Sequence, residues 1–196
     1  TRFRWVSWAR DVYKRQDHGF PVRIIIPGFI GGRMIKWLSE ISVSDACSDN
    51  HYHFKDNRVL PVNVTPEQAE AEGWWFKPDY IINELGINSA ISRPGHGEVL
   101  DLARCGETYD VKGYAYSGGG RKIIRVEVTL DGGQSWHLVE DGNASHPPNT
   151  PTAAGKYWGW CHWTITVPTA DLLKAENVAC RAWDSAMNTQ PKELTW

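Results

Sequence analysis

The sequence predicts a mainly β protein, with the C-terminal piece of a mixed α/β domain in residues 17–86 and an immunoglobulin-like β-sandwich in residues 87–196. Two observations lead to this prediction. From residue 87 onward, short alternating stretches are separated by turn residues, which is typical of a sandwich of short strands. The clearest helix signal lies before residue 87. The length of 196 residues suits one ordinary domain, or one small domain and part of another.

Two strands and one long irregular segment are predicted in the first region. Residues 22–26 form a short continuous apolar run that Pro27 ends, as in a buried strand. Apolar residues alternate with serines around residues 41–43, which predicts a second strand. Residues 44–64 are polar and rich in turn formers, so we expect an irregular surface segment there.

One helix is predicted after this segment. Thr65 is a good helix cap, Pro66 fits the first turn, and Gln68 is placed to close a capping box with Thr65. Gly73 is expected to end the helix after about two turns.

The second region is predicted to consist of strands. Residues 123–130 alternate, a tight Asp-Gly-Gly turn follows at 131–133, and residues 134–139 return, which together predict a hairpin. A calcium loop is the alternative for the Asp-Gly-Gly run, but hairpin turn chemistry explains it better. Further strands are expected at 157–167 and 178–183. The first strand is predicted to carry Ile124, Val126 and Val128 on one face and Arg125 and Glu127 on the other.

Composition and charge exclude several classes of function. The net charge is −2 and the pI is about 6.4, whereas nucleic-acid binders usually carry a basic excess. No apolar run approaches the roughly 20 residues that span a bilayer, so no membrane segment is predicted. The cysteines are widely spaced without a C-x-x-C pair, which favours reduced thiols in a cytoplasmic protein. They are Cys47, Cys105, Cys161 and Cys180.

Residues 1–16 are predicted to be wholly or partly foreign to the native protein. Residues 11–16, Asp-Val-Tyr-Lys-Arg-Gln, are what translation of a common DNA-library adapter produces. The alternative is a natural basic segment with scattered aromatic residues. The abrupt change of pattern at His18 favours the adapter.

The segment that begins at His18 carries the strongest chemical signal. His18 and Arg23 flank the entry to the predicted buried strand, and a glycine-rich loop then precedes Arg33 and Lys36. Backbone N–H groups that glycines expose beside fixed cations can cradle a phosphate. On physical grounds alone, a glycine-rich turn with solvated cations is the commoner explanation.

Residues 18–38, HGFPVRIIIPGFIGGRMIKWL, resemble the pterin-binding signature of the sulfite oxidase and nitrate reductase family. The resemblance implies that molybdopterin contacts the histidine, the arginine five residues later, and the tripeptide after the glycine-rich loop. These positions are His18, Arg23, Met34, Ile35 and Lys36, with Arg33 beside them. The implied roles are hydrogen bonding and charge pairing with the cofactor and its phosphate.

The resemblance covers nearly all of residues 17–196 and favours the nitrate reductase branch. It is carried by HFKDNRVLP (53–61), GWWFKPDYIINEL (73–85), GYAYSGGGRK (113–122), RVEVTLDGGQSW (125–136), YWGWCHW (157–163) and RAWDSAMNTQP (181–191). Asn57 matters most, because sulfite oxidases carry a tyrosine at the matching place in the substrate pocket. An amide can donate a hydrogen bond to a nitrate oxygen, although a turn would also use an asparagine in Asp-Asn-Arg.

This resemblance implies an enzyme of nitrate assimilation that reduces nitrate to nitrite at a molybdenum–molybdopterin centre. The thiolate that binds the metal is expected upstream of this chain. No metal ligand is therefore predicted within the chain, and the chain alone is predicted to be inactive. Haem and FAD are expected only in downstream domains.

Residues 87–196 resemble the dimerisation domain of the same family, which implies a homodimer formed through this region. The 11 tryptophans are then expected to pack the sandwich and its junction with the cofactor domain. A sugar-binding platform of exposed rings is the rival explanation. Two alternative functions stay open: a sulfite oxidase-type enzyme, which Asn57 disfavours, and a non-catalytic β-sandwich binding module.

Overall fold

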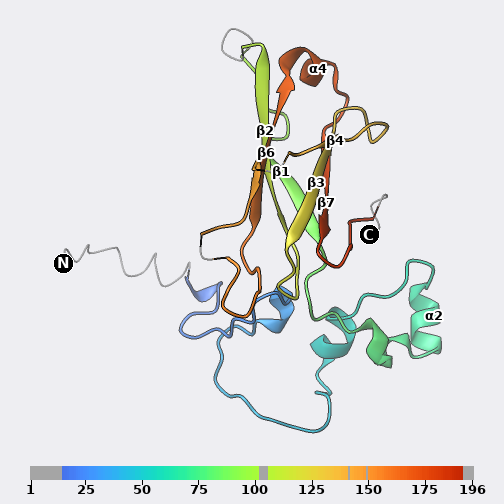
Figure 1. The fold of residues 1–196 in the computed structure, drawn as a ribbon. Helices are drawn as coiled ribbons and strands as arrows, with labels where there is room; N and C mark the ends of the chain where they lie inside the picture. The colour runs from blue at the N-terminus through green and yellow to red at the C-terminus, as the bar shows by residue number, and fades with distance from the viewer. Residues whose placement is uncertain (1–14, 102–105, 141, 149, 192–196) are drawn as a thin grey trace, which may run out of the picture. The chain divides into compact units, whose positions relative to one another are not determined.

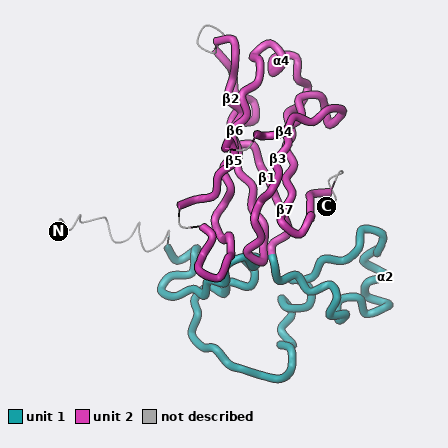
Figure 2. Tube along the Cα trace, in the orientation of Figure 1, with its two compact units in different colours: residues 1–84, 196 teal, residues 85–195 magenta. Residues whose placement is uncertain are grey.

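The computed structural model describes residues 15–101, 106–140, 142–148 and 150–191. The chain separates into two compact units, residues 1–84 and residues 85–195 (Figure 2), and the boundary predicted from the sequence lies two residues further along the chain. The prediction that residues 1–16 are foreign falls on residues of which 1–14 lie outside the described part. No helix in the described part of the chain is long and apolar enough to cross a membrane.

The second unit is a β-sandwich of two antiparallel sheets (Figure 1). One sheet has the strand order β1-β2-β6-β5, and the other has the order β4-β3-β7. The elements are β1 (Asn88–Arg93), β2 (Thr108–Tyr116), β3 (Ile123–Thr129), β4 (His137–Leu138), β5 (Ala144–Ser145), β6 (Cys161–Pro168), the short helix α4 (Thr169–Lys174) and β7 (Ala179–Asp184). The predicted mainly β, two-sheet fold is therefore confirmed.

The core of this unit lies between the two sheets. Alternate residues of β2 point inward because successive side chains of a strand face opposite sides. The buried cluster joins both sheets and α4 and comprises Tyr109, Val111, Ala115, Ile123, Val126, Val128, Val139, Cys161, Trp163, Val167, Leu172 and Ala182. Trp163 is the largest fully buried side chain. Its ring fills the space above Gly113, where an added Cβ would lie only 2.2 Å from a ring carbon of Trp163.

The predicted hairpin is present and its turn satisfies its own carboxylate. The backbone N–H groups of Gln134 and Ser135 donate to Asp131 Oδ1 at 3.0 and 2.9 Å, and the Thr129 hydroxyl donates to the same oxygen at 2.7 Å. The Ser135 hydroxyl donates to Asp131 Oδ2 at 2.5 Å. Hydrogen bonds from Ser135 are the largest cause of a pKa at Asp131 far below its ordinary value. The hairpin explanation of this run is therefore supported by its geometry.

The predicted faces of β3 are wrong in two places. A register shift between Ile123 and Arg125 turns Ile123 into the core and leaves Ile124 48% exposed. Glu127, predicted on a polar face, is only 3% exposed. Its carboxylate forms ion pairs with Arg125 and with Arg181 of β7. A bulge and a buried charge pair depend on the neighbouring strand, so the alternation within β3 could not predict them.

The tryptophans do not all serve the core. Trp163 is buried as expected, but Trp158 and Trp160 are 42% and 49% exposed. The Trp160 ring stacks on Tyr114 with a centroid separation of 4.4 Å. The expectation that the tryptophans pack the sandwich therefore holds for Trp163 but not for Trp158 and Trp160.

The first unit consists of short helical turns joined by irregular chain. They are η1 (Gly31–Arg33), the π-helix η2 (Tyr52–Asp56), the α-helix α2 (Pro66–Ala71), η3 (Trp74–Phe76) and η4 (Pro78–Tyr80). The predicted capping box of α2 is confirmed, with the Thr65 hydroxyl accepting from Gln68 N–H and the Gln68 side chain accepting from Thr65 N–H. Gly73 adopts the left-handed conformation, with φ +64°, soon after the helix.

The two strands predicted in the first region are not formed. Ile25 is 65% exposed and Val43 is 98% exposed, and neither lies in a strand. Ile24 N–H donates to Ile35 O at 3.1 Å, and Leu38 N–H donates to Val22 O at 2.9 Å. These bonds place the first segment beside residues 35–38 without a regular ladder. A short apolar run does not identify the segment with which it would pair, so the run at residues 22–26 was not enough to predict a regular strand.

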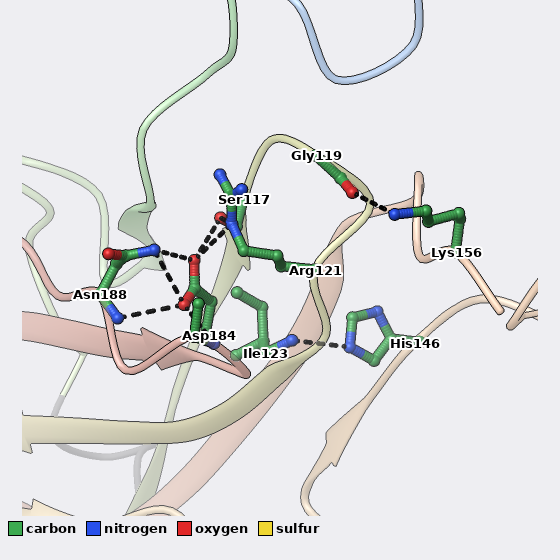
Figure 3. A network of polar contacts seen from close by, with 9 residues as sticks. Ser117, Gly119, Arg121, Ile123, His146, Lys156, Asp184 and Asn188 are labelled. Atoms are coloured by element: carbon green, nitrogen blue, oxygen red, sulfur yellow. Dashed lines mark hydrogen bonds and ion pairs between the residues drawn. The ribbon is translucent and has the colours of Figure 1, made fainter.

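The glycine-rich loop after β2 is held by a buried carboxylate at the end of β7 (Figure 3). Asp184 is fully buried. It accepts hydrogen bonds from the Ser117 hydroxyl at 2.7 Å and from Arg121 Nε at 2.9 Å. Asn188 Nδ2 donates to the same carboxylate at 3.0 Å. This network ties the loop of one sheet to the last strand of the other.

Candidate functional site

Arg23 links two segments of the predicted cofactor site. Its Nε donates to the Met34 carbonyl at 3.0 Å, and its Nη1 donates to the His18 carbonyl at 3.4 Å. Both acceptors belong to residues that the family resemblance assigns to cofactor binding. The guanidinium therefore holds the histidine turn against the segment after η1, so three of the predicted residues come together.

Lys36 joins the same group through a close backbone approach. Gly19 has φ +102°, and a Cβ added there would lie 3.0 Å from Lys36 Cβ. Trp37 N–H donates to Gly19 O at 3.3 Å. Any larger residue at position 19 would be strained and would push the lysine segment away. Ile35 contributes its carbonyl to Ile24, while its side chain is 53% exposed.

A pocket of about 510 Å³ opens beside this group. It is lined by Arg15, Asp17, His18, Gly19, Phe20, Pro21 and Arg23. Two of the predicted cofactor residues, His18 and Arg23, therefore face the same space. A histidine and two arginines along one pocket provide donors and positive charge for an anionic ligand, and one carboxylate, Asp17, lines the same pocket.

Arg33 belongs to a second group, which it forms with His53 and with the segment that follows η4. Its Nε donates to the Ile82 carbonyl at 3.0 Å, and its Nη1 lies 3.0 Å from His53 Nδ1. Burial lowers the pKa of Arg33, and the charge of Arg58 lowers it further. Its role in this structure therefore differs from that of Arg23, since it anchors η1 to η2 and to the segment that follows η4.

Asn57 lies against the backbone of η1. A Cβ added to Gly32 would meet Asn57 Oδ1 at 2.5 Å, so glycine is required for this approach. Asn57 Nδ2 donates to Tyr52 O at 2.9 Å. One of its two amide hydrogens is thus used inside the protein, and a bound anion would draw on the other. The structure brings Asn57 against Gly32, and Arg33 is the next residue in the chain.

His53 and Arg58 complete this second group, and the sequence analysis missed both. Arg58 is only 8% exposed, and its Nη1 donates to the Lys77 carbonyl at 2.8 Å. Its guanidinium lies 5.1 Å from the centre of the Phe54 ring. The sequence analysis had little reason to single out His53 and Arg58, because they are basic residues near Asn57 in a segment without any periodicity.

Three nitrogen atoms in this group are shielded from solvent and have no hydrogen-bond partner among the described residues: Arg33 Nη2, His53 Nε2 and Arg58 Nε. Within the same part of the chain, no carboxylate forms an ion pair with either arginine. Buried donors without acceptors are costly and usually have a functional reason. Donors and positive charge of this kind fit an anionic group, as a pterin phosphate or a small oxyanion would be. No cluster of three or more His, Cys, Asp or Glu side chains that could hold a metal ion occurs in the described residues.

Comparison with known proteins identifies relatives for both units. Residues 14–52 match the oxidoreductase molybdopterin binding domain family, and residues 79–196 match the Mo-co oxidoreductase dimerisation domain family. The chain is 57% identical over 182 residues to nitrate reductase [NADH] 2 of Phaseolus vulgaris, 92% of this chain and 20% of the relative. It is 58% identical over 180 residues to nitrate reductase [NADH] 1 of Zea mays, 91% of this chain and 28% of the relative.

A third relative, nitrate reductase [NAD(P)H] of Hordeum vulgare, is 56% identical over 182 residues, again 92% of this chain and 20% of the relative. The chain thus spans between a fifth and somewhat more than a quarter of these relatives. The predicted resemblance to the molybdopterin family and to nitrate reductases is confirmed by these matches. Because the larger match covers more than half of its length, the chain belongs to the Mo-co oxidoreductase dimerisation domain family.

Proposed function

We propose that this chain is part of a molybdopterin-dependent nitrate reductase, in which residues 17–86 supply part of the cofactor and substrate pocket. The observation that carries the proposal is the packing of Asn57 against Gly32, beside Arg33 and Arg58. Asn57 packs on the glycine loop, and Arg33 and Arg58 directly follow Gly32 and Asn57 in the chain, so this segment supplies an amide and two cations for a small planar anion. The nitrate reductase relatives support the same substrate.

His18, Arg23, Met34, Ile35 and Lys36, with Arg33, are the residues proposed to hold the cofactor. Arg23 orders the backbone around His18 and Met34, and Lys36 would supply positive charge for the cofactor phosphate. Bound molybdopterin would supply the metal that takes an oxygen atom from nitrate. The part played by this chain is to orient the anion and to stabilise negative charge, for which Asn57 is the proposed substrate contact.

Residues 87–196 are proposed to form a homodimer interface. The family match over residues 79–196 supports this role. Sedimentation equilibrium of the 196-residue chain measures it directly, with a dimer expected at micromolar concentrations. A chain that stays monomeric at high micromolar concentration contradicts the dimer proposal and leaves the nitrate proposal to its own test.

A chimaera tests the nitrate proposal. Residues 17–191 of this chain replace the matching segment of the Phaseolus vulgaris enzyme, and nitrate reduction is measured with a reduced viologen dye as donor. We expect activity, and we expect Asn57→Ala to raise the KM for nitrate about tenfold, the effect of losing about 1.4 kcal/mol of anion binding. Asn63→Ala, an exposed position in the same segment, is the matched control and should leave KM unchanged.

Two results would overturn the nitrate proposal. One is a chimaera that takes up molybdenum and cofactor but reduces no nitrate. The other is an Asn57→Ala variant whose KM equals that of the Asn63→Ala control. A gain of sulfite oxidation by the unmodified chimaera would point instead to the sulfite oxidase-type enzyme.

A further inference from the structure

His53 has a contact that determines its protonation state. Its Nδ1 lies 3.0 Å from Arg33 Nη1. A guanidinium has only donors to offer and stays charged in proteins. His53 Nδ1 must therefore accept this hydrogen bond, which requires a neutral imidazole with its proton on Nε2.

The surroundings of His53 favour that neutral form. Burial lowers the pKa of His53, and the positive charges of Arg33 and Arg58 lower it further. Arg33 reaches the ring from η1, and Arg58 acts from the segment that follows η2. Protonation would remove the acceptor from Nδ1 and place three positive charges in one partly buried cluster.

The same contact determines where η1 lies. Arg33 is held by two hydrogen bonds, one to the Ile82 carbonyl and one to His53. Gly32, the preceding residue, is packed directly on the Asn57 side chain. A displacement of the Arg33 guanidinium therefore changes the position of η1 relative to Asn57.

We propose that neutral His53 is a positioning residue that holds Arg33, so that η1 and Asn57 act as one anion-binding unit which opens when the imidazole is protonated. This inference rests on the proposed function, because it takes Asn57 as a contact of the substrate anion. It adds a residue to the site and predicts an acid limit for anion binding. The donors left without partners, Arg33 Nη2 and His53 Nε2, belong to the same unit.

The protonation part is tested on the 196-residue chain by nitrogen-15 NMR of the histidine rings and arginine Nη–H groups, because Arg33 Nη1 is the atom that contacts His53. We expect His53 to be the Nε2–H tautomer near neutral pH and to gain a proton only at a pH below the ordinary range of a histidine, because burial and the charges of Arg33 and Arg58 lower its pKa. The Arg33 Nη1–H signal should exchange faster with water as that proton is gained, whereas the Nε–H that donates to Ile82 O is the internal reference. An Nδ1–H tautomer, or a charged His53 at pH 7, overturns the inference.

Two substitutions separate positioning from simple packing. His53→Gln keeps a carbonyl oxygen that can accept from Arg33 but cannot titrate, so the Arg33 signal should persist and lose its pH dependence. His53→Leu removes the acceptor, so the signal should be lost at every pH. His51→Gln, an exposed neighbour two residues earlier, is the control and should keep the wild-type profile. If His53→Leu does not fold, the wild-type titration and His53→Gln still decide the matter.

The functional part is tested in the chimaera through the KM for nitrate. Between about pH 7.5 and about pH 5.5, KM should rise as pH falls in the wild-type segment and stay flat in His53→Gln. His53→Leu should raise KM about tenfold at both ends while kcat changes less than about twofold. Equal pH profiles for wild type and His53→Gln overturn the inference even if nitrate is reduced. A chimaera that reduces no nitrate contradicts the proposed function, and the NMR results then decide the His53–Arg33 contact by themselves.

Discussion

Asp184 offers the sharpest test of what holds the sandwich together. It is fully buried and accepts from Ser117, Arg121 and Asn188, as well as from the backbone N–H of Ala186 at 2.9 Å. Replacing it with alanine removes the acceptor that Ser117, Arg121, Asn188 and Ala186 share, so each of these donors loses a hydrogen bond. We expect a loss of about 3 kcal/mol in the free energy of unfolding. The lower end of the usual range applies because the Arg121 side chain is 26% exposed.

The stability that Asp184 contributes should also depend on pH. Burial by itself would raise the pKa of Asp184, but hydrogen bonds from Asn188 and Ser117 outweigh burial and lower the pKa from 3.8 to about 2. Because the pKa is lower in the folded state, the contribution is complete above about pH 4. It is lost as pH falls toward 2. The difference corresponds to about 2 kcal/mol.

Urea unfolding followed by tryptophan fluorescence measures both effects. Asp184→Asn keeps the shape but not the charge, so it should lose about 1 to 2 kcal/mol and flatten the acid decline. Asp110→Ala is the matched control on the same unit, since its side chain is 47% exposed and pairs only weakly with Lys112. It should change stability by less than about 1 kcal/mol. If Asp184→Ala is no more damaging than this control, the network does not stabilise the sandwich as argued.

Two further predictions concern the same unit. Gly113→Ala should lower its free energy of unfolding by about 3 kcal/mol, because the added Cβ would lie 2.2 Å from the buried Trp163 ring. Gly86→Ala is the control, since nothing lies within 4 Å of the added Cβ, and it should unfold in urea like wild type. Equal urea midpoints for both variants would contradict the packing argument. Burial raises the pKa of Cys161 to about 11, and its side chain is 2% exposed. Cys161 should therefore resist a disulfide reagent at pH 8 until urea is added, while the exposed Cys47 reacts at once; peptide mapping of the labelled thiols checks this, and rapid native labelling of Cys161 would refute it.

Local patterns predicted those elements whose stabilising contacts lie close in the sequence. The capping box of α2 joins residues three apart, and the Asp131 turn satisfies its own carboxylate, so both could be predicted from a few residues. The strands β3, β4, β6 and β7 were predicted for the same reason, since alternation is a property of each strand alone, whereas no strand was predicted at the positions of β1, β2 and β5. The strands expected at 22–26 and 41–43 were wrong because a strand also needs a partner, which the run itself does not specify.

Only those residues of the candidate site that lie in recognisable family motifs were predicted from the sequence. The motif at residues 18–38 named His18, Arg23, Arg33, Met34, Ile35 and Lys36, and the stretch 53–61 named Asn57. Their assignment to cofactor and substrate stays a proposal. The motifs did not indicate that Arg33 turns toward His53, because those residues lie 20 apart along the chain and meet through irregular segments.

The sequence by itself predicted the mainly β class, the two-part organisation and the membership in a molybdopterin family. Strand alternation, turn residues and a long signature are each contained in a continuous stretch of sequence, so they can be recognised without the fold. Only the tertiary structure decided which charges are buried together. Asp184 is held by Ser117, Glu127 by Arg181 and His53 by Arg33, and in each case the partners are 20 or more residues apart. The pKa values of Asp184 and His53 depend on burial, hydrogen bonds and neighbouring charge, which are properties of the folded chain and not of any segment.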